Sequence, residues 1–320
     1  MKKRFLVILS LLFICGGIAL AAVGKVKGGS FSWRFDLTKF KVVAGNNDYI
    51  SETVKVGAFN KLVVDTSTID VNISRGSEYS VSYYLPEDKK PEITENNGVL
   101  TVKGYEKNSF MVFDFSFLSS CDDAYINVTI PDGTYTKVVD IKSSTADIKI
   151  SSLNVDGSIS TSTGDIRLDD NEMCNFTLSV STGDIFIKNC NFESLETKSS
   201  TGEVKIDNCV INGNYIAKTS TGDVTVNDSE LGRFTLDGST SDVTVSSSSI
   251  DNIKLETSTG EVKLGLIGNE EDYTVEIHTS TGDIDINGEE YEKKYKRVSS
   301  GINSINISTS TGDVDIDFGK

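Results

Sequence analysis

The chain has 320 residues, of which 38% are hydrophobic and only three are proline, which argues against wholesale disorder. Its 47 acidic residues outnumber 31 lysines and arginines, for a formal net charge of −16, which disfavours nucleic acid and anionic lipid as partners. The five cysteines follow no CxxC or Cys-to-His spacing, so neither a zinc site nor a dense disulfide scaffold is indicated.

The first 27 residues read as a membrane-directed segment. Three basic residues follow Met1, and Phe5 to Gly24 are uncharged. Twenty uncharged, predominantly apolar residues match the bilayer thickness, which favours an uncleaved anchor. The flanking charges then leave Met1 in the cytoplasm and the rest outside, as a single-pass cell-membrane protein with an extracytoplasmic β domain. Ala19-Leu20-Ala21 is similar to a signal-peptidase site, so the alternative is a secreted chain cleaved near Ala21.

Residues 28–140 are predicted to form an N-terminal β region. Alternating apolar residues interrupted by turn sequences indicate strands at Leu62 to Ile73, Tyr79 to Tyr83, Val99 to Val102 and Tyr125 to Ile130. These strands follow no fixed spacing. We expect this region to cap one end of the repeats described next, because an uncapped solenoid exposes unpaired backbone groups.

A Ser-Thr-Gly-Asp motif and its close variants recur nine times in residues 141–320. The spacings between successive motif threonines are 18, 19, 19, 20, 19, 19, 22 and 30 residues. The motif threonines are Thr145, Thr163, Thr182, Thr201, Thr221, Thr240, Thr259, Thr281 and Thr311. A degenerate tenth copy, at 67–70, lies far upstream.

Apolar residues occupy fixed columns when the copies are aligned on this threonine. Every copy has an aliphatic residue three and five positions later, such as Ile166 and Leu168, which indicates a strand with one buried face. Further columns lie about ten and thirteen positions later. A unit this short buries its apolar face only by stacking on its neighbours, so residues 141–320 are predicted to form a parallel β-helix, or β-solenoid, of about 19-residue coils. Right-handed winding is expected; the alternative is an array of antiparallel hairpins.

Acidic residues form another column, two positions after each threonine. Glycine and polar side chains at this step indicate a corner between two strands. Stacked carboxylates repel one another and attract cations, so a weak cation-binding edge is the alternative to a purely structural corner. The residues of that edge are Asp165, Asp184, Glu203, Asp223, Asp242 and Glu261. No dedicated metal site is predicted, because the calcium-binding GGxGxD repeat is absent.

Three further patterns bear on function. Cys190 and Cys209 occupy the same place in consecutive coils, close enough for a disulfide or for two stacked free thiols.

The column three positions before the threonine mixes charged and hydroxyl residues, which disfavours a regular ice-binding lattice. The single histidine, His278, lies in that outward column, and the central coils have no long loops to form a cleft. No catalytic residue or cofactor is therefore predicted, although β-helices also host polysaccharide-active enzymes.

The STGDI-x-I phrases, YINVTIPDGTY followed by SSTADIKI, and the late ISTSTGDVDI resemble the bacterial putative-adhesin family of β-strand-repeat proteins of unknown function. The resemblance covers the chain after residue 48 and implies a cell-envelope location and interaction rather than turnover. It implies a non-enzymatic scaffold or adhesin-like module that contacts a protein or glycan at the cell surface. The alternative is an accessory or sensory subunit of an envelope-stress system, which binds a membrane protein partner.

Overall fold

The protein is described here by a computed structural model, which covers residues 33–36, 41–44, 49–104, 112–114, 124–131 and 137–319. The chain divides into two compact units. The first comprises Met1–Ser51, Tyr84–Lys90 and Lys107–Ala124, and the second comprises Glu52–Tyr83, Pro91–Glu106 and Tyr125–Lys320. The described residues form strands and two single-turn 3-10 helices, η1 (Glu87–Lys89) and η3 (Glu270–Asp272). The described part of the chain is therefore all-β, as predicted.

The first unit contains a small antiparallel sheet. Its strands are β1 (Trp33–Asp36), β2 (Lys41–Ala44) and β9 (Val112–Asp114), with β1 in the centre. Phe35 is paired with Val42 on one side and with Phe113 on the other.

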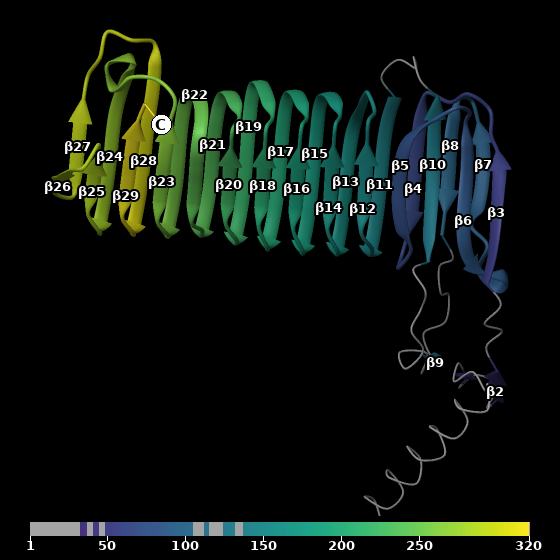
Figure 1. Cartoon of the computed structure of the whole chain (residues 1–320). Helices are drawn as coiled ribbons and strands as arrows, with labels where there is room; N and C mark the ends of the chain where they lie inside the picture. The colour runs from purple at the N-terminus through teal and green to yellow at the C-terminus, as the bar shows by residue number, and fades with distance from the viewer. Residues whose placement is uncertain are drawn as a thin grey trace, which may run out of the picture. The chain divides into compact units, whose positions relative to one another are not determined.

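The second unit is a stack of coils, each contributing one strand to each of two parallel sheets (Figure 1). The short-strand sheet contains β12 (Ile148–Ser151), β14 (Ile166–Asp169), β16 (Ile185–Lys188), β18 (Val204–Asp207), β20 (Val224–Asn227), β23 (Val262–Leu266), β25 (Ile284–Ile286) and β29 (Val314–Phe318). The long-strand sheet contains β11 (Lys137–Thr145), β13 (Val155–Thr163), β15 (Glu172–Thr182), β17 (Asn191–Thr201), β19 (Val210–Thr221), β21 (Glu230–Thr240), β24 (Tyr273–Thr281) and β28 (Asn303–Thr311). β22 (Val243–Thr259) runs through both sheets.

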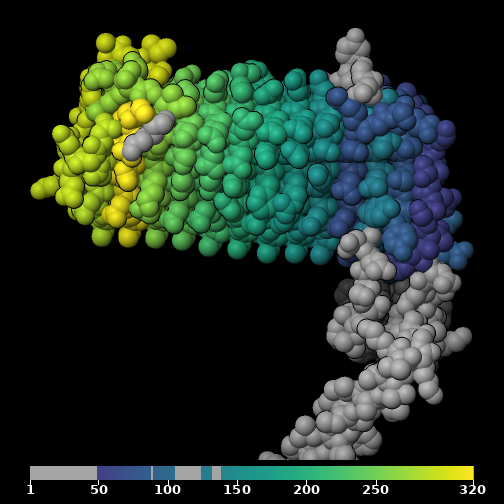
Figure 2. All heavy atoms as spheres, viewed as in Figure 1, coloured from purple at the N-terminus to yellow at the C-terminus, as the bar shows by residue number. Residues whose placement is uncertain are grey.

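The predicted stacking register is confirmed. Ile166 is the direct parallel partner of Ile185, which is in turn the partner of Val204. All three side chains are buried, as are the columns three and five positions after each threonine. The same-type residues therefore form continuous rows through the core, and the alternative of an antiparallel hairpin array is wrong. In Figure 2 the visible face of the stack is a continuous surface of parallel ridges.

At the N-terminal side, the upstream strands join the same two sheets. β4 (Lys61–Thr66) pairs in parallel with β11, and β5 (Asp70–Gly76) pairs with β12. The degenerate motif between them, residues 67–70, thus lies directly beside the motif of Thr145. The long-strand sheet continues through β8 (Val99–Lys103) to the antiparallel β7 (Glu92–Asn96). The short-strand sheet continues through β10 (Tyr125–Pro131) to β6 (Ser80–Pro86) and β3 (Tyr49–Lys55).

At the other side, the coils do not follow chain order. β28 lies between β22 and β24, and β29 lies between β23 and β25 (Figure 1). The outermost strands are the antiparallel β26 (Glu289–Tyr291) on β25 and β27 (Lys294–Arg297) on β24. Antiparallel strands therefore close both sheets at this side.

The predicted leader at residues 5–24 lies outside the described residues. Within the part of the chain that the structure does describe, no helix has the length and apolar character needed to cross a membrane.

Candidate functional site

The motif corner places two columns of hydroxyl groups on the surface. In each of the nine coils the motif serine and threonine are both exposed, and no hydrogen bond from their hydroxyls to other described residues occurs. Parallel neighbours stand about 4.8 Å apart, so the hydroxyls form two regular rows. The column three residues before the threonine is chemically mixed, as predicted, and its members are exposed except for the half-buried Ser179 and Lys198. The more regular array is the motif itself.

The glycine at the corner is required by close backbone packing. Gly183 has φ +134°, and a Cβ there would lie 2.3 Å from the carbonyl oxygen of Gly164 in the preceding coil. Two coils have another residue at this position, Ala146 and Ser241. Ser241 is 1% exposed, and its side chain occupies the space left by Gly238, where most coils have an inward-facing serine or threonine. The exchange thus compensates for volume within the coil, while the buried Ser241 Oγ has no hydrogen-bond partner among the described residues.

The acid column is a hydrogen-bond ladder. Asp147 Oδ1 accepts the backbone N–H of Asp165 at 2.8 Å, and Asp165 Oδ1 accepts that of Asp184 at 3.0 Å. From Asp70 at one side to Asp283 at the other, the acid column contains nine pairs of acids in neighbouring coils. The same contact, at 2.8–3.0 Å, occurs in seven of these pairs. Each N–H places a partial positive charge against the carboxylate it contacts, and this attraction opposes the repulsion between the acids of neighbouring coils.

The two steps without this bond are those where the acceptor would be glutamate. Glu203 lies in the coil next to that of Asp223, and Glu261 lies in the coil next to that of Asp313. Among the described contacts, the backbone N–H of Asp223 is not bonded to Glu203, and that of Asp313 is not bonded to Glu261. The extra methylene moves the carboxylate away from the backbone of the next coil. The structure thus assigns aspartate a role at the corner that glutamate does not fill.

Basic neighbours pair with several of these acids. Arg167 Nη2 lies 2.7 Å from Asp165 Oδ2, and Lys263 Nζ lies 2.8 Å from Glu261 Oε2. In the described ranges no group of three or more histidine, cysteine, aspartate or glutamate side chains is arranged to hold a metal ion. The six acids of the predicted cation edge therefore lie in one row, as expected from the sequence, but that row does not converge on a point.

A second corner was missed in the sequence. Seven positions after the threonine, Asp170, Asn189 and Asn208 have φ between +51° and +55°, a left-handed conformation that asparagine and aspartate tolerate. Asn189 Nδ2 donates to Asp170 Oδ1 at 2.9 Å, and Asn208 Nδ2 donates to Asn189 Oδ1 at 2.8 Å. The signal was the recurrence of Asn, Asp or Ser at this position in successive coils.

The two predicted stacked cysteines belong to a buried polar row beside this corner. Cys190 and Cys209 are free thiols in this structure, and each donates to a backbone carbonyl two residues earlier. The backbone N–H of Cys190 faces Cys209 Sγ at 3.4 Å, and that of Cys209 donates to Ser229 Oγ at 3.0 Å. The hydrogen bond with Cys190 and burial raise the pKa of the Cys209 thiol, so it stays protonated.

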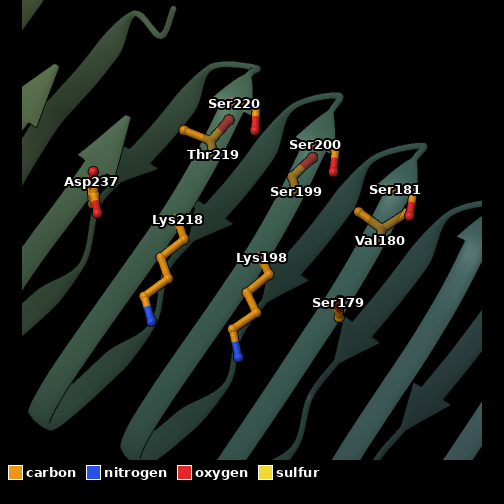
Figure 3. Close-up of a pocket in the computed structure, with 10 residues that line it drawn as sticks. All are labelled: Ser179, Val180, Ser181, Lys198, Ser199, Ser200, Lys218, Thr219, Ser220 and Asp237. Atoms are coloured by element: carbon orange, nitrogen blue, oxygen red, sulfur yellow. The ribbon is translucent and has the colours of Figure 1, made fainter. Parts of the chain in front are cut away.

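A shallow hollow of about 440 Å³ lies beside the hydroxyl columns on the long-strand sheet (Figure 3). Lys198 and Lys218 extend side by side from adjacent strands along it, with Ser200 and Ser220 at its rim. Both ammonium groups lie 3.1 Å from one oxygen of Glu196. The hydrogen bond from Lys218, assisted by Lys198, lowers the pKa of the Glu196 carboxyl. The surface therefore offers hydroxyl, ammonium and carboxylate groups close together.

His278 is exposed, as predicted, and its Nδ1 lies 3.2 Å from the carbonyl oxygen of Lys293. It has no acidic side chain or nucleophile as a hydrogen-bond partner among the described residues. The histidine therefore lies on the surface of β24 and contacts the connection between β26 and β27.

Among sequence models of protein families, the model of Toastrack DUF4097 matches residues 59–317 of the chain. The chain belongs to the Toastrack family. The resemblance drawn from the motif phrases is thereby confirmed. No curated protein matches the Toastrack chain in sequence.

Solved structures share its fold. A protein of Bacteroides fragilis, described as a putative adhesin, is 15% identical to the Toastrack chain, with a TM-score of 0.52 over 68% of this chain and 96% of its own. A protein of Parabacteroides distasonis, described as a putative lipid binding protein, is 13% identical, with a TM-score of 0.51 over 86% of this chain and 98% of its own. At these identities the likeness shows the fold alone.

Proposed function

We propose that the chain is a non-enzymatic interaction module: an adhesin-like β-solenoid, wound right-handed, that is held outside a membrane by residues 5–24 and binds a protein or glycan at the cell surface. The observation that carries the proposal is the paired hydroxyl column at the motif corner. Eighteen exposed serine and threonine side chains in nine coils have hydroxyls with no partner among the described residues, so they are available to a ligand.

The chemistry of the surface favours binding over turnover. Hydroxyl groups donate and accept hydrogen bonds, and they match the hydroxyls and amides of glycans and extended peptides. The hollow beside Lys198 and Lys218 is open and shallow, so it does not exclude water from a reacting group. The solved structure described as a putative adhesin supports this choice through its shared fold.

The acid column is assigned a structural role. Each aspartate of the ladder uses one oxygen to bind the next coil, which leaves the other oxygen to solvent and to neighbouring cations. The column attracts cations diffusely along the corner.

The test is binding of the full chain, displayed on cells, to target cells and to an array of surface glycans. Replacing Thr182, Thr201 and Thr221 with valine removes three hydroxyls while keeping the β-branched shape. We expect at least a tenfold loss of binding. The matched control replaces Thr225 and Thr244, which face outward on the short strands, with valine and leaves binding unchanged. Equal binding by the motif variant and the wild type would contradict the proposal.

Release from the membrane separates the two functions expected from the sequence. A chain lacking residues 1–27 should still bind cells or glycans if it is an adhesin-like module. If instead the released chain binds no surface, and the cell loses a response to envelope damage, the accessory-subunit alternative is supported.

A further inference from the structure

The coil formed by residues 303–319, here called the terminal coil, is inserted between two coils that precede it in the chain. Its strand β28 pairs in parallel with β22 on one side and β24 on the other, and β29 pairs with β23 and β25 (Figure 1). The two flanking coils are consecutive in sequence. They are nevertheless separated in space by a segment that follows both of them in the sequence.

The two flanking coils have the same register relative to the terminal coil. Val262 and Ile284 are both partners of Val314, and Thr259 and Thr281 are both partners of Thr311. The flanking coils thus share one register, with aliphatic residues and motif threonines in the same columns. The space between them is therefore a slot for one coil of defined register.

The terminal coil fills this slot with ordinary core contacts. Ile305, Ile307, Val314 and Ile316 are all buried. One contact also spans the slot: the hydroxyl of Tyr273, in the outer flanking coil, donates to the carbonyl oxygen of Ile250 at 3.0 Å. That contact holds the outer coil at a separation of two coil steps from β22.

The connection into the slot is exposed. Residues 298–302 lead from β27, on the outer side of β24, across the start of β24 to β28 on its inner side. Val298 is 77% exposed and Ile302 is 95% exposed. Gly301 makes the crossing, where a Cβ would lie 2.1 Å from the carbonyl oxygen of Asp272. A core element on an exposed linker, whose apolar side chains Val298 and Ile302 contribute little to the core, is the arrangement that domain exchange requires.

We propose that the slot also binds the terminal coil of a second copy of this chain, so that two copies pair by exchanging residues 303–319. Because the exchanged segment is identical, every contact in the slot is kept, and the exchanged and closed forms differ only in the linker and in concentration. The pair is reciprocal, with each chain giving and receiving one coil. This assembly does not depend on what the hydroxyl columns bind.

The first experiment traps the exchange with a disulfide in the full chain. Thr259 and Thr311 are exposed direct partners, so cysteines there can bridge the slot. The native Cys15, Cys121 and Cys174 are replaced by serine. Refolding over a hundredfold range of protein concentration, followed by oxidation, should give a covalent dimer whose fraction rises with concentration. The control pair, cysteines at Thr182 and Thr201, joins coils that are consecutive in sequence and should crosslink within one chain at every concentration.

The second experiment shortens the linker. Removing Ser300 and Gly301 leaves three residues, which span at most about 11 Å, while the crossing covers two strand spacings of about 4.8 Å and must pass over β24. Returning to its own slot then requires a nearly extended, strained linker, so the dimer fraction at a given concentration should rise at least tenfold. Inserting two glycines at the same place should lower it.

Two results would overturn the proposal. One is a Thr259–Thr311 cysteine pair that crosslinks only within a chain at all concentrations. The other is a shortened variant that stays monomeric, with residues 303–319 cleaved readily by protease; the flanking coils would then have closed directly on each other.

Discussion

Replacing Glu203 with aspartate should stabilise the protein. Seven aspartates of the acid column accept the N–H of the next coil at 2.8–3.0 Å, and Glu203 does not. The shorter side chain should restore that bond to the N–H of Asp223 without changing the charge. Because water competes at this corner, we take the usual net value of a hydrogen bond, about 1 kcal/mol. For a stack of this size that corresponds to a rise in melting temperature of about 2 °C.

The assay is urea unfolding of the full chain, with Asp184→Glu as the matched reverse change. That variant breaks the 2.8 Å bond to Glu203 and should lose a similar free energy of unfolding. Both changes keep the net charge, so a difference between them reports the hydrogen bond rather than repulsion. If Glu203→Asp destabilised the protein because it brings the carboxylates closer together, the ladder would not be what holds this corner.

Three other perturbations and a metal titration test the packing and the corner. Gly183→Ala forces a methyl group 2.3 Å from the carbonyl oxygen of Gly164 and should lower the free energy of unfolding by about 2 kcal/mol or more, measured by urea unfolding. Tyr215→Phe removes the buried hydroxyl 3.2 Å from Thr197 Oγ1 and should cost about 1 kcal/mol; no loss would show that this pair is not a stabilising hydrogen bond. Burial, with the hydrogen bond to Glu52, raises the pKa of Tyr83 to about 12. The stabilisation of the fold by the neutral Tyr83 hydroxyl is complete below the unfolded-state pKa near 10. It is lost as the pH rises from about 10 to 12, so the melting temperature should fall over that window. Calcium should give no calorimetric heat and no shift in melting temperature, because no described acidic cluster converges on a cation site.

The stacking of the coils could be predicted because the residues of one column in the aligned repeats become direct neighbours in one row of the folded core. Ile166, Ile185 and Val204 are spaced by one coil in sequence and are direct partners in space. A period of about 19 residues and a period-2 apolar pattern are enough to determine that register. The corner was also predictable, since glycine and aspartate favour turns.

The order of the coils could not be predicted in the same way. Thr311 carries the same columns as every other motif, so its coil is compatible with several positions, and the spacings of 22 and 30 residues show only that the connections are longer. Similarly, residues 67–70 pair beside Thr145, although 77 residues separate Asp70 from Asp147. Long connections decide these placements, and their sequences carry no periodic signal.

The partner of each corner aspartate was not predictable either. Sequence reasoning assigned Asp165 and Asp184 to turn chemistry within their own coil, whereas each accepts an N–H from the next coil. Turn propensities describe local backbone bonds. The inter-coil bond depends on the length of the side chain relative to the strand spacing, which appears only after the coils are stacked.

Uniform columns also make the length of the stack adjustable. A duplicated or deleted segment of one coil, for instance residues 183–201, would leave every remaining row continuous, since each coil presents the same pattern to both neighbours. Such a change would move whatever is attached at the two sides of the stack by about 4.8 Å per coil. Gain or loss of a coil would therefore change the length of the stack without changing the pattern of its core.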